Sequence, residues 1–118
     1  MRLLLVEDSE PLALALTEVL EHAGHSVHLE GTMRGAMDAL YAQEFDCVIA
    51  DGRFPSHHAW QPPQDWGLDL LRMARNRKVP GILHSADEGL VNEARKQGFA
   101  AVLKTGDMKE LLAAVEGA

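Results

Sequence analysis

Several short apolar runs of this chain end in residues that can do chemistry. The run at residues 3–6 ends in Glu7 and Asp8, and the run at 47–50 ends in Asp51. Ser85 follows a third run, and Lys104 follows a fourth. If these runs are parallel strands, their carboxyl ends share one sheet edge, which is where open α/β sheets bind ligands. The sequence therefore predicts that three carboxylates, a hydroxyl and an ammonium group converge.

This combination of groups favours phosphoryl chemistry at a metal site. Three carboxylates a few ångströms apart repel one another, so something must neutralise them. Mg²⁺ is a hard cation that takes one or two carboxylates together with phosphate oxygens and water. An ammonium and a hydroxyl beside it suit the other oxygens of a phosphoryl group. One carboxylate can itself act as the nucleophile and form an acyl phosphate.

The rest of the chain supplies elements that can position these groups. Apolar runs at 3–6, 27–29, 47–50, 81–84 and 101–103 predict five strands, and segments of helical period lie between and after them. Ser9 (with Pro11 in the first turn) and Thr32 read as helix N-caps. Asp107 followed by Glu110 predicts a capping box for the last helix. Five strand–helix units predict a single α/β domain over residues 1–118, a parallel sheet with helices on both faces.

Composition limits the function classes. The chain has 118 residues, 47% of them apolar, and a net charge of −7. Such an acidic balance argues against a nucleic-acid surface, which needs a basic stripe. No run has the length of a membrane helix or the pattern of a signal peptide, and the only cysteine, Cys47, cannot form an internal disulfide. We therefore expect a cytoplasmic protein with no direct nucleic-acid or membrane partner.

Each of these residues also has a plainer interpretation. Asp51 alone is equally consistent with a polar strand end. The plainer alternative for Lys104 is a solvated lysine at a strand end, and for Glu7-Asp8 it is a helix cap. The six histidines lack chelating spacing, so no zinc site is predicted. Trp60 and Trp66 fit either a partner-binding patch or a small satellite core.

Four motifs taken together resemble the receiver domains of two-component response regulators over essentially the whole chain. They are LLVEDS at 4–9, DCVIAD at 46–51 with Pro55 four residues later, VPGILHSA at 79–86, and Lys104. Each lies at a predicted strand end. The resemblance implies a flavodoxin-like, three-layer fold whose five parallel strands have the order 2-1-3-4-5.

The resemblance also implies a role for each site residue. Asp51 would accept a phosphoryl group, Ser85 would bond one of its oxygens, and Lys104 would neutralise another. Asp8 would bind Mg²⁺ directly, together with Asp51 and the backbone carbonyl of Arg53, and Glu7 would act mainly through water. The implied partners are a sensor histidine kinase or a phosphotransfer protein and an output protein, with a homodimer left open.

Three departures from the family pattern stand out. Thr105 replaces the proline that usually follows the lysine, and a cis bond to a residue other than proline is costly. The fifth strand lacks the usual aromatic residue, with Ala101 and Val102 in its neighbourhood. A loop at about 56–66 is inserted directly after the phosphorylation motif, where it is expected to form a stable flap over or beside the site.

We therefore expect a signalling phosphoacceptor that assists its own phosphotransfer and dephosphorylation, rather than an enzyme with a separate substrate. The alternative is a pseudo-receiver, which docks partners without being phosphorylated. A Mg²⁺-dependent phosphatase is disfavoured, because Arg53 stands where the common motif has a second aspartate.

Overall fold

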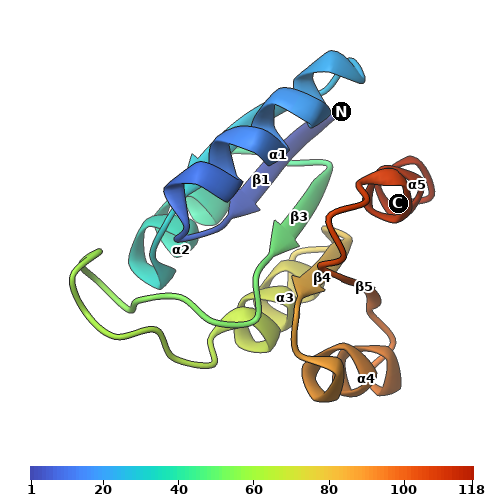
Figure 1. Cartoon of the computed structure of the whole chain (residues 1–118). Helices are drawn as coiled ribbons and strands as arrows, with labels where there is room; N and C mark the ends of the chain where they lie inside the picture. Colours follow the sequence, from blue (N-terminus) through green and yellow to red (C-terminus); the bar gives the residue numbers. More distant parts are fainter.

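Strands and helices alternate strictly along the chain (Figure 1). The structure is a computed structural model that describes all 118 residues. Its elements are β1 Arg2–Val6, α1 Glu10–His22, β2 Ser26–Glu30, α2 Met33–Ala42, β3 Cys47–Ala50, α3 Gly67–Asn76, β4 Gly81–Ser85, α4 Glu88–Lys96, β5 Ala100–Leu103 and α5 Lys109–Glu116. All five predicted strands are present, each within one or two residues of its predicted bounds.

The five strands form one parallel sheet in the order β2-β1-β3-β4-β5, which confirms the predicted fold class. Its register sets the strand ends at one level. Val6 of β1 lies opposite Ala50 of β3, and Ala50 lies opposite Leu83 of β4. The residues that follow these positions therefore emerge side by side at the carboxyl edge of the sheet.

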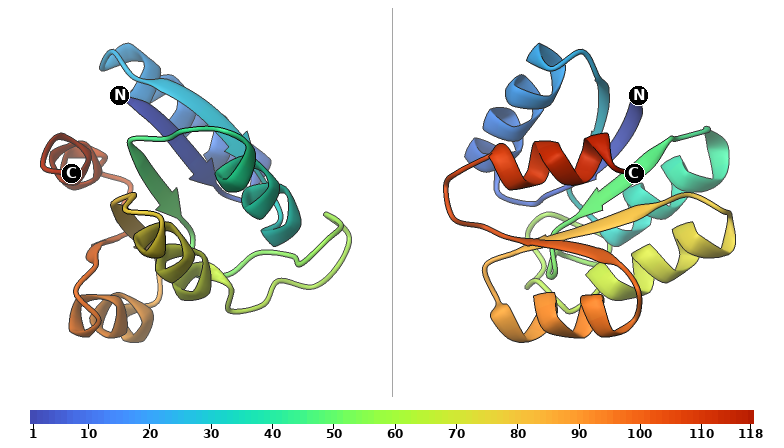
Figure 2. Two further views of the ribbon diagram at one scale, coloured as in Figure 1. Left: turned by 180° about the vertical axis from the view of Figure 1, so that it is seen from behind. Right: turned by 90° about the vertical axis from the view of Figure 1, so that its right-hand side faces the viewer.

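Helices cover both faces of the sheet, as the two views of Figure 2 show. One core lies between the sheet and helices α2, α3 and α4, and the other between the sheet and helices α1 and α5. Alternate residues of each strand serve the two cores, because successive side chains of a strand point to opposite faces. In β3, for example, Val48 and Ala50 belong to the first core, and Cys47 and Ile49 to the second. This alternation decides which polar residues share a face at the carboxyl edge.

The predicted N-cap positions of α1 and α2 are confirmed, but that of α5 is not. The Thr32 side chain accepts a hydrogen bond from the Gly35 N–H at the start of α2, and Ser9 occupies the N-cap position of α1 without a side-chain bond. The capping box at Asp107 is wrong. The Asp107 carboxylate accepts the N–H of Lys109 at 2.9 Å, so it closes a local turn, and α5 begins only after Met108.

The segment between β3 and α3 has no helix or strand of its own, but it is not loose. Phe54 is fully buried and pairs with Gln64 in an isolated antiparallel bridge. The two tryptophans of this segment differ in environment. Trp66 packs against the first core, whereas Trp60 is 79% exposed. Each of the two interpretations of the pair therefore fits one tryptophan.

The helices are short. None of them combines the length and the apolar character that a membrane crossing requires.

Gly67 is the tightest backbone junction beside the sheet edge. A Cβ at this position would lie 2.3 Å from the carbonyl oxygen of Asp51 and 2.8 Å from the Cα of Gly52. We predict that Gly67→Ala lowers the free energy of unfolding by about 1–3 kcal/mol, because backbone must shift to admit the methyl group. Gly117→Ala is the control, since its Cβ would meet only ordinary contacts at 3.5 Å or more. Urea denaturation checks both, and equal losses in the two variants would contradict this account.

Candidate phosphoryl-transfer site

Lys104 lies at the centre of the predicted site. Its Nζ donates a hydrogen bond to Glu7 Oε1 at 2.8 Å and another to Asp51 Oδ2 at 2.9 Å. The other oxygen of Asp51 accepts the N–H of Gly52 at 2.6 Å, and the other oxygen of Glu7 accepts the N–H of Ser9 at 3.1 Å. Residues from the ends of three separate strands thus meet at the carboxyl edge, as the sequence predicted.

Asp8 completes an acidic cluster. One carboxylate oxygen from each of Glu7, Asp8 and Asp51 lies within 4.8 Å of the others, a spacing that fits a single metal ion. Three carboxylates and one ammonium leave two negative charges uncompensated. Oxygen ligands and this residual charge suit a divalent cation such as Mg²⁺. The donor set therefore fits the predicted cofactor.

Burial sets the electrostatics of this cluster. Burial raises the pKa of Glu7, the Lys104 bond offsets part of that, and the nearby charge of Asp51 raises it further. For Lys104, burial works to lower the pKa, but the bonds to Glu7 and Asp51 outweigh it, so the pKa lies above its ordinary value. The lysine is therefore charged at neutral pH, and the cost of keeping Glu7 ionised is relieved by any added cation.

Ser85 lies on the other side of Asp51. A Cβ on Gly52, the residue after Asp51, would be 3.2 Å from Ser85 Oγ and 2.7 Å from a methyl of Leu90 in α4. The Ser85 hydroxyl accepts the N–H of Asp87 at 3.1 Å, and Asp87 in turn caps α4. Ser85 therefore connects the acidic edge to the first turn of α4.

The side chain of Arg53 pairs with another residue rather than with the acidic cluster. Arg53 lies two residues after Asp51, and its exposed side chain pairs with Asp65 at 3.0 Å. A carbonyl contact between Arg53 and a metal stays a prediction.

Each of the three sequence departures has a structural outcome. The Lys104–Thr105 peptide is trans, and Lys104 still reaches both carboxylates. Ala101 and Val102 are buried, so no aromatic side chain stands on β5. The inserted loop leaves the carboxyl edge of the sheet and runs out past the start of α2 (Figure 1), to which it is hydrogen-bonded through its backbone.

His84 lies beside the candidate site, a position that the sequence did not reveal. The β3–β4 register pairs Ala50 with Leu83, so the next residues, Asp51 and His84, are neighbours on the same face of the sheet. His84 is only 4% exposed, and burial, reinforced by the charge of Lys104, lowers its pKa to about 4. An uncharged imidazole therefore flanks Asp51 in the sheet. The signal was a histidine inside an apolar run, but its face depends on the register.

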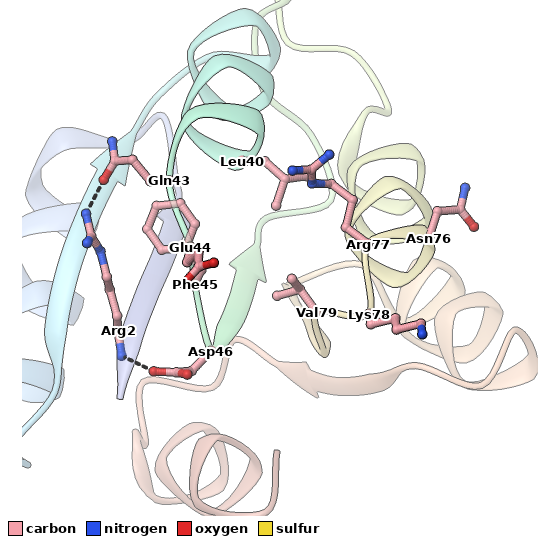
Figure 3. A pocket seen from close by; sticks show the side chains of 10 residues that line it. All are labelled: Arg2, Leu40, Gln43, Glu44, Phe45, Asp46, Asn76, Arg77, Lys78 and Val79. Carbon is pink, nitrogen blue, oxygen red and sulfur yellow. Dashed lines mark hydrogen bonds between the residues drawn. The ribbon is translucent and has the colours of Figure 1, made fainter.

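The molecule also has a cavity away from this site. It holds about 770 Å³ at the amino ends of the strands, between the connections that precede β3 and β4 (Figure 3). Arg2, Asp46 and Arg77 are among its lining residues, and Arg2 donates its backbone N–H to Asp46 at 2.7 Å. Its charges are mixed, and it lies at the opposite end of the sheet from the acidic cluster.

The fold and the acidic edge can be compared with those of known proteins. No family model matches the sequence. The response regulator TrrA of Thermotoga maritima, solved with Mg²⁺ and BeF, superposes with a TM-score of 0.82 at 22% identity, covering 98% of this chain and 96% of TrrA. The non-phosphorylated HemR receiver domain of Leptospira biflexa gives a TM-score of 0.77 at 29% identity, with 98% and 91% covered.

Curated relatives point the same way. Sensory/regulatory protein RpfC of Xanthomonas campestris is 29% identical over 85 residues, covering 72% of this chain and 11% of RpfC. Response regulator ArlR of Staphylococcus saprophyticus is 25% identical over 118 residues, covering 97% of this chain and 50% of ArlR. The chain thus spans half or less of these relatives. Together with the site, the matches show that the chain has the fold of response-regulator receiver domains and is similar to them in sequence, at 25–29% identity.

The buried imidazole makes a testable contribution to stability. Because the pKa of His84 is about 4 in the folded state and near 6.5 when unfolded, the unfolded chain binds the extra proton between these values. Its contribution is therefore present above pH 6.5 and is lost as the pH falls toward 4, by up to about 3 kcal/mol. We predict that His84→Leu unfolds with a weaker pH dependence than wild type across this window.

Urea denaturation at a series of pH values measures this slope. His22→Leu, which removes an exposed histidine of α1, is measured alongside as the matched histidine-to-leucine variant. A wild-type slope in His84→Leu would show that the imidazole does not titrate as described.

Proposed function

We propose that residues 1–118 form a receiver domain with an inserted loop at about 56–66. This domain takes a phosphoryl group onto Asp51 from a phosphohistidine and switches protein contacts in response. The observation that supports this most is the bridging of Glu7 and Asp51 by Lys104 at the sheet edge. The same geometry disfavours a pseudo-receiver, since it retains the acidic cluster together with the lysine. The switching of contacts follows the role of receiver domains in two-component signalling.

The metal site of this proposal consists of residues around Asp51. Asp8 and Asp51 would bind Mg²⁺ through carboxylate oxygens, Arg53 through its backbone carbonyl, and Glu7 mainly through water. Bound Mg²⁺ would neutralise charge on the transferred phosphoryl oxygens. Asp8 is the most exposed of the three carboxylates, so a hydrated ion can reach it first.

The reaction itself is an in-line displacement. A carboxylate oxygen of Asp51 attacks phosphorus as the P–N bond of the donor breaks. The electron pair of that bond stays on the donor imidazole nitrogen, and the imidazole takes up one proton from the solvent. Lys104 then exchanges its bond to Asp51 Oδ2 for one to a phosphoryl oxygen. Ser85 would bond a second phosphoryl oxygen from the opposite side.

The same groups support return to the resting state. Lys104 and Ser85 hold the phosphoryl oxygens whether the nucleophile is Asp51 or water, so the chain would assist its own dephosphorylation as well as its phosphorylation. No separate substrate is involved. The chain is a signalling phosphoacceptor, not an enzyme with turnover on another molecule.

Output would begin at α4. The hydroxyl of Ser85 accepts the Asp87 N–H beside the N-cap of α4, and Leu90 of its first turn touches Gly52. Drawing Ser85 toward a phosphoryl group would stretch that bond and displace this turn. With Ala101 in place of an aromatic residue, this contact would transmit the change without an aromatic side chain. An output protein remains an expected partner, with a homodimer left open.

The acceptor residue can be tested directly. Acetyl phosphate with Mg²⁺ is expected to add one phosphoryl group to the wild-type protein, as a base-labile acyl phosphate on Asp51. Asp51→Asn should abolish labelling, because an amide does not attack phosphorus. Asp38→Asn, on the exposed side of α2, is the control and should label normally. Intact-mass and peptide mass spectrometry read out both, and a labelled Asp51→Asn protein would place the acceptor elsewhere.

Charge counting predicts opposite effects of two substitutions on Mg²⁺ affinity. Lys104→Met removes the only cation of the cluster, so Mg²⁺ should bind about tenfold more tightly. Asp8→Asn removes an anionic ligand and should weaken binding by about tenfold or more. Isothermal titration calorimetry measures both, with circular dichroism to confirm folding. Shifts in the same direction would mean that the ion does not lie in this cluster.

A further inference from the structure

The segment between Arg53 and Asp65, here called the Trp60 loop, is closed at its base by three interactions. Phe54 and Gln64 exchange two backbone hydrogen bonds of 3.1 and 3.0 Å. Outside this bridge, Arg53 and Asp65 form an ion pair at 3.0 Å. The fully buried Phe54 ring ties the base to the core. The two arms of the loop are therefore held together directly after Asp51.

The tip of the Trp60 loop, from Ser56 to Gln64, is also ordered. The side-chain oxygen of Gln61 accepts hydrogen bonds from Ser56 Oγ and from the N–H groups of His57 and His58, at 2.9 to 3.1 Å. The rings of His58 and Trp60 stack at 5.4 Å with an angle of 7° between their planes. Trp60 is nevertheless 79% exposed, the largest exposed fraction among the big apolar side chains. A large apolar ring is thus held in one orientation in water.

Contacts with α2 fix the position of the tip relative to the acidic edge. The carbonyls of Pro55 and Ser56 accept the N–H groups of Met33 and Arg34, both at 2.9 Å. Helix α2 begins on that edge, and the loop extends outward past this helix start (Figure 1). The tip is therefore a rigid extension of the edge at which Asp51 lies.

A protein that delivers a phosphoryl group to Asp51 must cover most of this edge. A specific protein contact buries about 800 Å² on each partner. The molecule measures 31 × 30 × 29 Å, so a footprint of that size centred on Asp51 is comparable to the whole edge. The base of the Trp60 loop lies inside such a footprint, and the tip stands at its border. A small phosphodonor, in contrast, touches only the carboxylates, Ser85 and Lys104.

We propose that Trp60 is a docking residue for the protein phosphodonor, which inserts the exposed ring into an apolar pocket beside its phosphohistidine. This inference rests on the proposed function and adds a specificity surface to it. The tip suits such a contact because Trp is one of the residue types enriched among binding hot spots. Its stacking on His58 and the bonds of Gln61 mean that little conformational entropy is lost when the partner binds. The tip has no charged residue from Ser56 to Gln64, so the complementary surface is apolar rather than ionic.

The test compares two kinds of donor on the same variants. The histidine kinases encoded in the source genome are purified and autophosphorylated with ATP, and the one that phosphorylates the wild-type chain fastest is the protein donor. Acetyl phosphate is the small donor. Trp60→Ala should slow transfer from the kinase at least tenfold and leave acetyl phosphate labelling unchanged. Trp60→Phe, which keeps a ring on His58, should restore most of the kinase rate.

Tyr41→Ala is the matched control, because Tyr41 is an exposed aromatic residue at the far end of α2 and its ring packs under Arg77. Both donors should phosphorylate it as they do wild type. Equal kinase rates for Trp60→Ala and wild type would overturn the proposal, as would equal slowing with both donors. Loss of a wild-type dimer in Trp60→Ala, with kinase transfer unchanged, would assign the tip to self-association instead.

Absence of transfer from every kinase, with acetyl phosphate still labelling Asp51, would also overturn it, since the proposal requires a protein donor. Failure of acetyl phosphate to label wild-type Asp51 would instead contradict the proposed function itself. The two failures are therefore distinguishable.

Discussion

Repulsion among three carboxylates at one sheet edge is the constraint on which the rest of the site depends. Glu7, Asp8 and Asp51 are brought within 4.8 Å by the ends of β1 and β3, and a single ammonium lies among them. The lysine lowers the repulsion without cancelling it. The two remaining negative charges favour a divalent cation at this edge. A cation and a phosphoryl group would stabilise each other there, so removal of one would weaken the binding of the other.

Hydrophobic burial supplies the free energy that holds this unfavourable arrangement. Two cores, one on each side of the sheet, fix β1, β3, β4 and β5 so firmly that their polar ends have no freedom to separate. The alternation of side chains along the strands then sorts the edge. Asp51 and His84 share a face with Glu7 and Lys104, and Ser85 projects on the other side toward α4. The alternation of side chains along the strands thus determines both which residues meet in the site and which residue contacts α4.

The fold and most residues of the candidate site could be predicted from the sequence, for a physical reason. Strands buried on both faces are continuous apolar runs, so their ends are sharp, and the residues at those ends are the site. His84 was missed because its importance depends on which residue of β3 lies opposite, and register is not visible in a single strand. The start of α5 was missed because Asp107 bonds to Lys109 locally, an alternative that the same residues allow. The separate fates of Trp60 and Trp66 depend on the path of a long loop, which periodicity does not describe.

The hydrogen bonds between the Trp60 loop and α2 have a consequence for the way the molecule assembles. Two of the first N–H groups of α2 find their acceptors on Pro55 and Ser56, more than twenty residues further along the chain. During synthesis, this helix therefore lacks part of its N-terminal cap until β3 and the residues beyond Asp51 have emerged. Helix α2, strand β3 and the first residues of the loop should form as one cooperative unit, with amide protons at the helix start that exchange in step with those of the loop. Any shortening of the loop that removed Ser56 would shorten the helix as well.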